Sequence, residues 1–482
     1  MDTLFKVKDT LKPCKAEVRE MEGVTDPNEL LTIQLNYRGI DEESGDIDFV
    51  QATKYILNRC QLFYVASSDD YYIKNFRWNV TEPIGKIAMK KLVSHIFEEA
   101  DESCFLPNWS DRVLKTMENY VDSYSEKPPE SAVWSFPNGD FDIEKLEFGP
   151  KKNSTINYHV MDYSFQEDSD CPLFKKVIKE ICCEDESMVE LLQEIMGYCL
   201  DKGTAKAQKM FFAIGGGSNG KSIWTEQIVR MLPKGLSCSQ PLHGMSQRFA
   251  LSNMVDSAVN ISPEVASQTI TDADASIIKA VTGGTDLVEI DVKYAQKTSK
   301  TITAKCICCS NHYLSSTDGS HGFWRRIEVL PFQKRFVTEN DPERTPDCGI
   351  IDVTLSQKLL NERAGIFNFA VEGLRRLRQN QYIFTHCERS KALKKEFVLR
   401  SNLMKCFISE HLRFGKDRKI SSPDLHCGFL EWTELKGFDA SEYENKNKFH
   451  KMFRDELVKS GNKIEIRKIQ GKKFYYGFDL KS

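Results

Sequence analysis

Residues 209–232 place a glycine-rich turn between an apolar run and an amphipathic segment, KMFFAIGGGSNGKSIWTEQIVRML. The turn fits the phosphate-binding pattern G-x-x-x-x-G-K-[ST] with Gly215, Gly216, Gly217, Ser218, Asn219, Gly220, Lys221 and Ser222. Glycines let backbone N–H groups surround phosphates, and the N-terminus of the following helix adds a partial positive charge. Lys221 would reach the β- and γ-phosphates of ATP, and Ser222 would ligate Mg²⁺. The segment therefore predicts the start of an α/β fold that binds ATP and Mg²⁺.

Two later apolar runs predict strands that end in polar residues. Residues 258–264, AVNISPE, predict a strand neighbouring the P-loop strand and ending at Glu264, which would polarise the attacking water and hold Mg²⁺ through water. Pro263 stands where many P-loop ATPases have an aspartate, so Ser222 is expected to be the main protein ligand of Mg²⁺. A surface glutamate in a turn is the alternative. Residues 302–309 predict a strand ending near Asn311, which could sense the γ-phosphate or position water.

Two segments carry candidate cationic contacts. Residues 287–305 predict two strands around a polar tip with Lys293, Tyr294, Lys297 and Lys300, which suit a phosphate backbone and a stacked base. A solvated hairpin explains the same pattern equally well. Arg325 and Arg326 follow a bulky aromatic pair, and an arginine inserted into a neighbour's ATP site stabilises charge in phosphoryl transfer. An ordinary surface arginine pair is the alternative.

Charge is distributed unevenly along the chain, although the net formal charge is only −4. Residues 1–200 have 22 Lys and Arg against 38 Asp and Glu, whereas residues 391–482 have 21 against 13. The basic end includes a predicted helix, 445–461, that carries Lys448, Lys451 and Arg454 opposite an apolar face. This pattern indicates contact with nucleic acid or another polyanion, and a solvated lysine-rich surface is the alternative.

Composition excludes several classes of protein. With 40% hydrophobic and 28% charged residues, the chain is expected to be globular rather than disordered. No apolar run is long enough for a membrane helix, and the charged start argues against a signal peptide, so a cytoplasmic location is expected. The 15 cysteines are expected to be reduced thiols. Cys306 and Cys309 have metal-like spacing but no second pair, which favours a buried strand over zinc.

The order of these motifs resembles that of a superfamily 3 AAA+ helicase. The series runs from the P-loop through the strand ending at Glu264, K-x-x-T-G-G at 279–284, the lysine-bearing hairpin and Asn311 to F-W-R-R at 323–326. It is most similar to the helicase portion of primase-helicases from phages, satellite phages, integrated mobile elements and poxviruses, over about residues 50–480. The resemblance implies a P-loop role for Lys221 and Ser222, a catalytic role for Glu264, a sensor role for Asn311 and an arginine finger at Arg325 or Arg326. It also implies that Lys293 and its neighbours track DNA.

The resemblance implies an α/β P-loop AAA+ core, an N-terminal α+β helicase-associated domain and a C-terminal winged-helix-like domain. The expected segments are a weakly ordered lead-in, the helicase-associated domain, the ATPase core, a helical segment and the winged-helix-like domain, at 1–50, 51–204, 205–335, 336–390 and 391–482. Only about 50 residues remain unassigned, so a separate primase or host replication proteins are expected as partners.

The implied function is a replicative DNA helicase of a phage or mobile element. It would form a ring, with a hexamer expected, and move 3′ to 5′ on single-stranded DNA. The basic C-terminal end would contact duplex DNA. Two alternatives stay open at this point: an origin-binding initiator that uses ATP as an assembly switch, and a non-helicase AAA+ ATPase that packages or remodels DNA.

Overall fold

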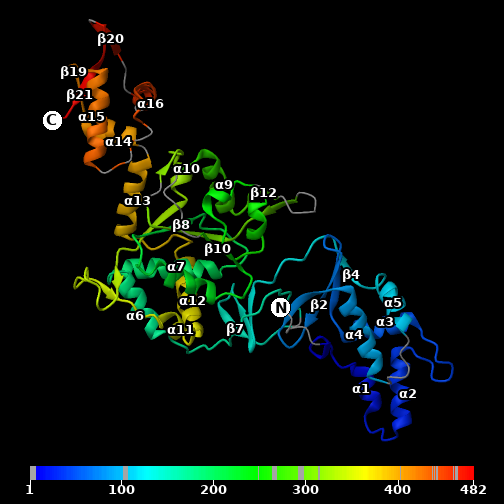
Figure 1. Cartoon of the computed structure of the whole chain (residues 1–482). Helices are drawn as coiled ribbons and strands as arrows, with labels where there is room; N and C mark the ends of the chain where they lie inside the picture. Colours follow the sequence, from blue (N-terminus) through cyan, green and yellow to red (C-terminus); the bar gives the residue numbers. More distant parts are fainter. Residues whose placement is uncertain are drawn as a thin grey trace. The chain divides into compact units, whose positions relative to one another are not determined.

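The computed structural model describes residues 7–100, 107–152, 154–247, 249–262, 269–290, 298–312, 315–401, 403–436, 438, 440, 443–459, 461, 465–469 and 471–481. The chain divides into two compact units (Figure 1). The first comprises Met1–Cys171, Arg230–Leu236 and Asn361–Val371, and the second comprises Pro172–Val229, Ser237–Leu360 and Glu372–Ser482. Within the described ranges, none of the helices has the length and apolar content that crossing a bilayer requires.

The first unit contains a four-stranded sheet of order β3-β2-β1-β4 and a three-stranded sheet of order β5-β6-β7. Within the four-stranded sheet, β1 and β2 form an antiparallel hairpin. The elements are η1 (Val7–Thr10), α1 (Lys15–Met21), α2 (Pro27–Arg38), α3 (Phe49–Arg59), β1 (Leu62–Val65), β2 (Asp70–Asn75), β3 (Val80–Ile84), α4 (Lys86–Glu98), α5 (Pro107–Met117), β4 (Asp122–Tyr124), β5 (Val133–Phe136), β6 (Gly139–Asp142) and β7 (Glu147–Gly149).

The expectation that residues 1–50 form a weakly ordered lead-in is wrong. The side chain of Asp26 caps α2 by accepting a hydrogen bond from the Asn28 N–H, and Gly39 ends the helix with a left-handed backbone. Leu35 and Ile40 are buried in the same core as α3. The apolar spacing of α2 is irregular, so its helix signals lie mainly at its two ends.

The second unit is built on a parallel sheet of order β16-β8-β14-β10-β9. Figure 1 labels two of its strands, β8 and β10. The strand–turn–helix expected over 209–232 is present as β8 (Met210–Ile214) and α8 (Lys221–Arg230). The apolar runs at 258–262 and 302–309 form β10 (Val259–Ser262) and β14 (Lys305–Ser310). The remaining strands of the sheet are β9 (Ser237–Cys238) and β16 (Ile327–Pro331).

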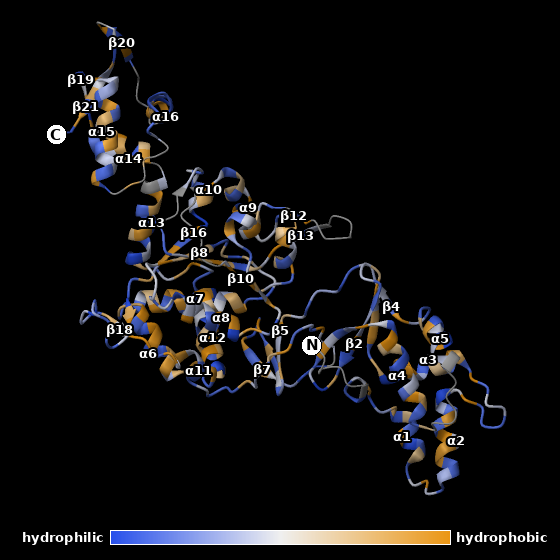
Figure 2. Ribbon diagram, viewed as in Figure 1, coloured by the Kyte–Doolittle hydropathy of each residue, from blue (hydrophilic) through white to orange (hydrophobic). Residues whose placement is uncertain are grey.

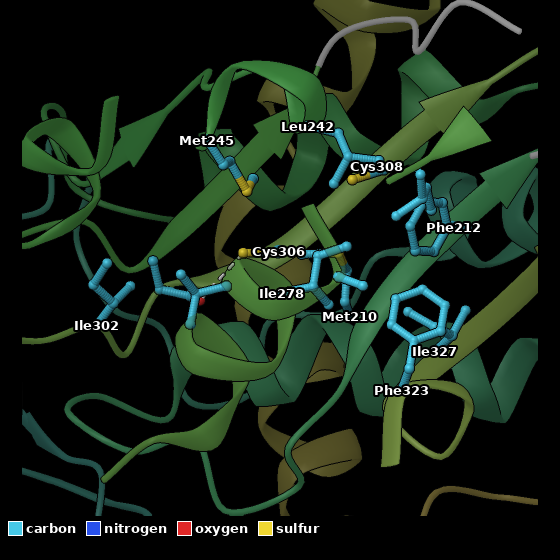
Figure 3. Packing of buried hydrophobic residues seen from close by; sticks show 14 of the residues in the cluster. Met210, Phe212, Leu242, Met245, Ile278, Ile302, Cys306, Cys308, Phe323 and Ile327 are labelled. Atoms are coloured by element: carbon cyan, nitrogen blue, oxygen red, sulfur yellow. Dashed lines mark hydrogen bonds between the residues drawn. The ribbon is translucent and has the colours of Figure 1, made fainter. Parts of the chain in front are cut away.

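Alternate residues of β8 pack on opposite faces of the sheet. Met210 and Phe212 lie in one core with Ile278 of α9 (Asp272–Gly283) and Phe323 of α10 (His321–Trp324) (Figure 3). On the other face, the ring of Phe211 contacts that of Tyr198 on α7 (Glu186–Leu200). Both faces of β8 are therefore covered, and all five of its residues are apolar and buried, as expected for a central strand of a parallel sheet.

Two helices assigned to the preceding domain lie in this unit. α6 (Pro172–Ile181) and α7 (Glu186–Leu200) lie within the range 51–204 expected for the helicase-associated domain, but they belong with the parallel sheet. The domain boundary expected at 204 therefore lies near Cys171. The physical reason is burial, since most residues of α7 are buried and its Tyr198 contacts Phe211 of β8.

Between Leu242 and Gln379, the smaller elements lie in the chain between the strands of the parallel sheet or after its last strand. Residues expected to be a helical segment, 336–390, begin instead with the short parallel pair β17 and β18. The elements are η3 (Leu242–Gly244), η4 (Ala250–Met254), β11 (Thr269–Ile270), β12 (Leu287–Ile290), β13 (Thr298–Thr301), β15 (Ser315–Ser316), β17 (Phe336–Val337), β18 (Gly349–Ile350), α11 (Leu355–Leu360) and α12 (Arg363–Gln379).

The C-terminal residues form a small core of their own around an antiparallel sheet of order β19-β21-β20. Both hydrophobic and hydrophilic residues lie along α16, where a helix was expected over 445–461 (Figure 2). Phe449, Phe453 and Leu457 of this helix are buried. The elements are α14 (Leu403–His411), β19 (Leu412–Ser421), α15 (Ser422–Leu435), α16 (Lys446–Lys459), β20 (Glu465–Ile469) and β21 (Lys472–Leu480).

The expected start of the C-terminal domain at residue 391 cuts through α13 (Glu388–Ser401). Phe397 of this helix is buried in the core of the parallel sheet, and Leu393 packs against that core. Ser390 donates a hydrogen bond to the carbonyl of Val329 on β16. The helix therefore completes the sheet's core, and the C-terminal core begins at α14.

Candidate nucleotide-binding site

The loop between β8 and α8 has a backbone that requires small residues. Gly217, Ser218 and Gly220 have φ angles of 94°, 45° and 85°. A Cβ on Gly215 would lie 1.9 Å from the side-chain nitrogen of Asn219, and one on Gly220 would lie 2.5 Å from Ile181. By contrast, a Cβ on Gly216 or Gly217 would meet nothing within 4 Å. The loop is thus packed on its inner side and open on its outer side, which fits a cradle for phosphate oxygens.

The ammonium group of Lys221 is held at the mouth of this loop. Its Nζ donates hydrogen bonds to the Gly215 carbonyl at 2.7 Å, to Asn219 Oδ1 at 3.0 Å and to Asn311 Oδ1 at 3.0 Å. An ammonium has three donors, so these acceptors satisfy its hydrogen-bonding capacity. The structure thus brings together two residues that lie 90 positions apart.

Asn219 connects the loop to the end of β16. While its Oδ1 accepts from Lys221, its Nδ2 donates to the carbonyl of Phe332 at 3.1 Å. The backbone N–H of Phe336 in turn donates to the carbonyl of Ser218 at 2.7 Å. The loop conformation is therefore supported by the chain segment that follows β16.

A cavity of about 640 Å³ opens beside the loop, a size suited to a nucleotide. One wall is apolar and comes from α6 and from the segment around β18. Its lining includes Leu173, Val177, Ile181, Gly217, Ser218, Asn219, Gly220, Lys221, Ser222, Ser262, Cys309, Asn311, Phe336, Ile350, Ile351 and Leu355.

Several of these lining residues are not predicted from the sequence. Nothing in the sequence of α6 indicates that it borders a site formed 40 residues later. Cys309, which the sequence places in a buried strand rather than a zinc site, lines the cavity, where burial raises the pKa of its thiol to about 11 despite the opposing charge of Lys221. Among the described residues, no group of three or more His, Cys, Asp or Glu side chains is placed to hold a metal ion.

β14 and β10 were both expected to lie next to β8, the strand that precedes the P-loop, but only β14 does. β14 pairs directly with β8, and the N–H of Gly215 donates to the carbonyl of Ser310. β10 pairs with β14 instead, so it lies one strand further from the loop than expected. Ser262, the last residue of β10, lines the cavity, whereas Glu264 lies outside the described residues. Ser222 is exposed in the first turn of α8.

The two arginines lie at the opposite edge of the sheet. Ile327 pairs with Met210 in parallel, so Arg325 and Arg326 precede the amino end of β16, whereas the loop follows the carboxyl end of β8. A five-residue strand spans roughly 13 Å, beyond direct contact between Arg325 and its own Lys221.

Arg325 and Arg326 differ in surroundings. Arg325 is exposed, and its Nη2 donates to Gln208 Oε1 at 2.9 Å. Arg326 is half-buried, and its Nη1 donates to the Gly322 carbonyl at 2.6 Å. Burial, and then the charge of Arg325, lower the pKa of Arg326, while Asp286 opposes the shift.

The candidate DNA contacts are only partly within the described chain. β12 and β13 form the expected antiparallel pair, but Lys293, Tyr294 and Lys297 lie outside the described residues. Lys300 is on β13, opposite Val288. On α16, Lys448, Lys451 and Arg454 are exposed, on the side away from the buried residues of that helix.

A family of unknown function, DUF5906, matches residues 213–326, the span from β8 to Arg326. "Putative helicase L207/L206" of Acanthamoeba polyphaga mimivirus is 22% identical over 431 residues, which are 82% of this chain and 42% of that protein. "Putative helicase 121R" of Invertebrate iridescent virus 3 is 21% identical over 366 residues, 70% of this chain and 38% of that protein.

The chain thus spans about two fifths of the length of these curated relatives. Among solved structures, the A form apo structure of the NrS-1 C-terminal region is 12% identical with a TM-score of 0.48, covering 87% of this chain and 95% of that one.

Proposed function

We propose that the chain is an ATP-hydrolysing DNA helicase that acts in the replication of a viral or mobile genome. The observation that carries the proposal is the contact between Lys221 and Asn311 at the carboxyl edge of a parallel sheet, beside a cavity of nucleotide size. Two viral relatives whose names include helicase support the class of activity.

In this proposal the loop binds ATP. The N–H groups of residues 216–222 and the N-terminus of α8 would receive the phosphates, and Lys221 would exchange one of its protein acceptors for a phosphate oxygen. Asn311 Oδ1 would then exchange the ammonium of Lys221 for the attacking water and orient it. Ser222 would hold Mg²⁺, which supplies charge neutralisation at the phosphates when bound, and Glu264 would act as the general base.

The position of the arginines supports action between subunits. Since Arg325 lies across the sheet from its own loop, its guanidinium would complete the site of a neighbouring copy, as in a ring. A hexamer that moves 3′ to 5′ on single-stranded DNA is the arrangement we propose. The β12–β13 hairpin with Lys293, Tyr294, Lys297 and Lys300 would contact the strand.

The C-terminal residues suit duplex binding. The element order α14-β19-α15-α16-β20-β21 with its antiparallel sheet supports a winged helix, in which α16 would enter the major groove. Lys472 and Lys473 are exposed beside the turn between β20 and β21, where a wing would meet the DNA backbone. This module favours a second candidate function, an origin-binding initiator that uses ATP mainly for assembly.

A strand-displacement assay on a forked duplex tests the proposal. Wild-type protein should release the displaced strand only with hydrolysable ATP and Mg²⁺, and Lys221→Ala should not. DNA-stimulated ATP turnover without displacement would contradict the helicase and support a packaging or remodelling ATPase. Melting of origin DNA by Glu264→Gln, without hydrolysis, would support the initiator instead.

A further inference from the structure

The side chain of Gln208 bridges two parts of the second unit. Its Oε1 accepts a hydrogen bond from Arg325 Nη2 at 2.9 Å, and its Nε2 donates to the carbonyl of Gly283 at 3.2 Å. Both halves of the amide are therefore used, which fixes its orientation. Gln208 has a φ of 51°, an uncommon conformation for a residue other than glycine, asparagine or aspartate.

The glycine pair at 283–284 lets the Gln208 segment approach. Gly284 ends α9 with a φ of 76°, and a Cβ there would lie 2.8 Å from that of Ala205. The N–H of Gln208 donates to the carbonyl of Ala205 at 2.8 Å, so the segment 205–208 is a tight turn that rests on the end of α9. This contact gives a structural reason for Gly284, the last residue of the motif at 279–284.

A second link joins the same elements on the other side of α10. Lys279 of α9 forms an ion pair with Asp318 at 2.5 Å. Asp318 also accepts from the N–H of Ser320, whose side chain caps α10 by accepting from the Phe323 N–H. The short helix that leads into Arg325 is thus attached to α9 both before and after it, and α9 leads directly into β12.

We propose that Gln208 is a positioning residue that holds Arg325 ready for a neighbouring subunit and joins it to the helix leading into the β12–β13 hairpin. The inference rests on the proposed function, because the arginine acts only where a second copy supplies the ATP site. A shift of Arg325 on engaging that site is passed to Gly283 through one side chain. Gln208 is not among the residues that line the candidate nucleotide cavity, so its effect is expected on turnover and on coupling rather than on ATP binding.

Two variants separate the two hydrogen bonds. Gln208→Asn keeps the left-handed backbone without strain, but its side chain is one methylene shorter and cannot span both partners. Gln208→Glu keeps an acceptor for Arg325 and loses the donor to Gly283. Gln381→Asn is the matched control, since Gln381 has a φ of 53° and is exposed.

Steady-state ATP turnover and strand displacement are measured for each protein. Gln208→Asn should lower kcat about tenfold or more with little change in KM. The reason is that a misplaced arginine stabilises the transition state less well but does not affect ATP binding. Gln208→Glu should recover turnover relative to Gln208→Asn but not strand displacement. Mixing Gln208→Asn with Lys221→Ala should restore part of the turnover, since Lys221→Ala subunits offer a correctly held Arg325.

A kcat for Gln208→Asn equal to that of Gln381→Asn would overturn the inference and leave the proposed function intact. The inference would also be overturned if mixtures of Gln208→Asn and Lys221→Ala assembled but recovered no ATP turnover, or if Gln208→Asn changed only KM. Absence of ATP turnover in the wild-type protein would overturn both the inference about Gln208 and the proposed function. The melting temperature of each variant is measured as a control. A value equal to that of the wild type shows that a loss of turnover does not arise from misfolding.

Discussion

Lys221 and Asn311 are the pair of side chains on which the candidate site depends. Lys221→Ala should lower ATP turnover by at least about a hundredfold, because the phosphates lose their ammonium partner. Asn311→Ala should lower kcat by a similar order while the affinity for ATP stays close to that of the wild type. Turnover and equilibrium binding of a fluorescent ATP analogue distinguish the two, with the exposed Lys54→Ala as control. Weakened binding in Asn311→Ala would contradict a sensor role.

Lys305 provides a pH-dependent test of the core. It is 3% exposed, its Nζ donates to the carbonyl of Asp201 at 2.5 Å, and burial lowers its pKa to about 8. An unfolded lysine has a pKa near about 10.4, so between about pH 8 and pH 10.4 the unfolded chain binds more protons. The free energy of unfolding contributed by Lys305 therefore rises with pH over this range.

Lys305→Met removes this contribution, while Asp201 keeps its contacts with Arg378 and Tyr382. The variant should be more stable than the wild type at about pH 7.5, and its advantage should shrink at about pH 9.5. Thermal unfolding at both values measures the difference. A difference that is the same at both pH values would show that Lys305 does not titrate as its burial implies.

At the scale of elements, α16 presents the clearest candidate DNA surface. Replacing Lys448, Lys451 and Arg454 with alanine should weaken duplex binding and reduce the salt slope by about 0.9 for each phosphate that is no longer neutralised. The side chains that support the fold lie on the buried side of the helix, so its stability should change little. The control replaces the exposed Lys391, Lys395 and Lys405. Equal slopes in both triple variants would contradict a specific role for α16.

The β12–β13 hairpin allows a parallel test with single strands. Neutralising Lys293, Lys297 and Lys300 should reduce the salt slope of single-strand binding by about 0.7 for each phosphate that these lysines neutralise, while ATP turnover without DNA persists. Filter-binding titrations at several salt concentrations measure the slope. Loss of DNA-independent turnover would show instead that the hairpin supports the nucleotide site.

At the scale of the whole molecule, two features decide the outcome of truncation. Phe397 of α13 is 2% exposed within the core of the parallel sheet, whereas α14 and later elements have a separate core. A chain ending after Ser401 should therefore keep ATP turnover and lose duplex binding. A chain ending after Ser390 should be destabilised, since removing a buried phenylalanine costs about 3–5 kcal/mol. Equal melting temperatures for the two truncations would contradict this division.

Assembly can be tested with two inactive proteins. Lys221→Ala offers Arg325 to a neighbour, and Arg325→Ala offers an intact loop, so a mixed assembly contains some complete sites. Part of the ATP turnover should return on mixing, with assembly monitored by light scattering. No recovery in assemblies of confirmed mixed composition would place the arginine's role within its own subunit.

The local sequence was sufficient to predict a helix, strand or loop wherever the signals for that element lie within its own residues. The glycines around residue 217, the lysine that follows and the apolar run before them predicted β8, the loop and α8 closely, because backbone strain and periodicity are properties of adjacent residues. The same holds for β14 ending beside Asn311 and for the amphipathic α16. α2 has weak periodicity but clear end signals, and the expectation of a weakly ordered lead-in over residues 1–50 is wrong there.

Only the tertiary structure decided which distant residues meet. Lys221 reaches Asn311 because β14 pairs with β8, and the order of strands in a sheet depends on packing that no single segment encodes. The apolar wall from α6, the membership of α13 in the core and the bridge made by Gln208 arise in the same way. Each of these is a contact between two segments, and the sequence of either segment alone is compatible with several neighbours. Which segments pack together is therefore determined by the free energy of the whole fold.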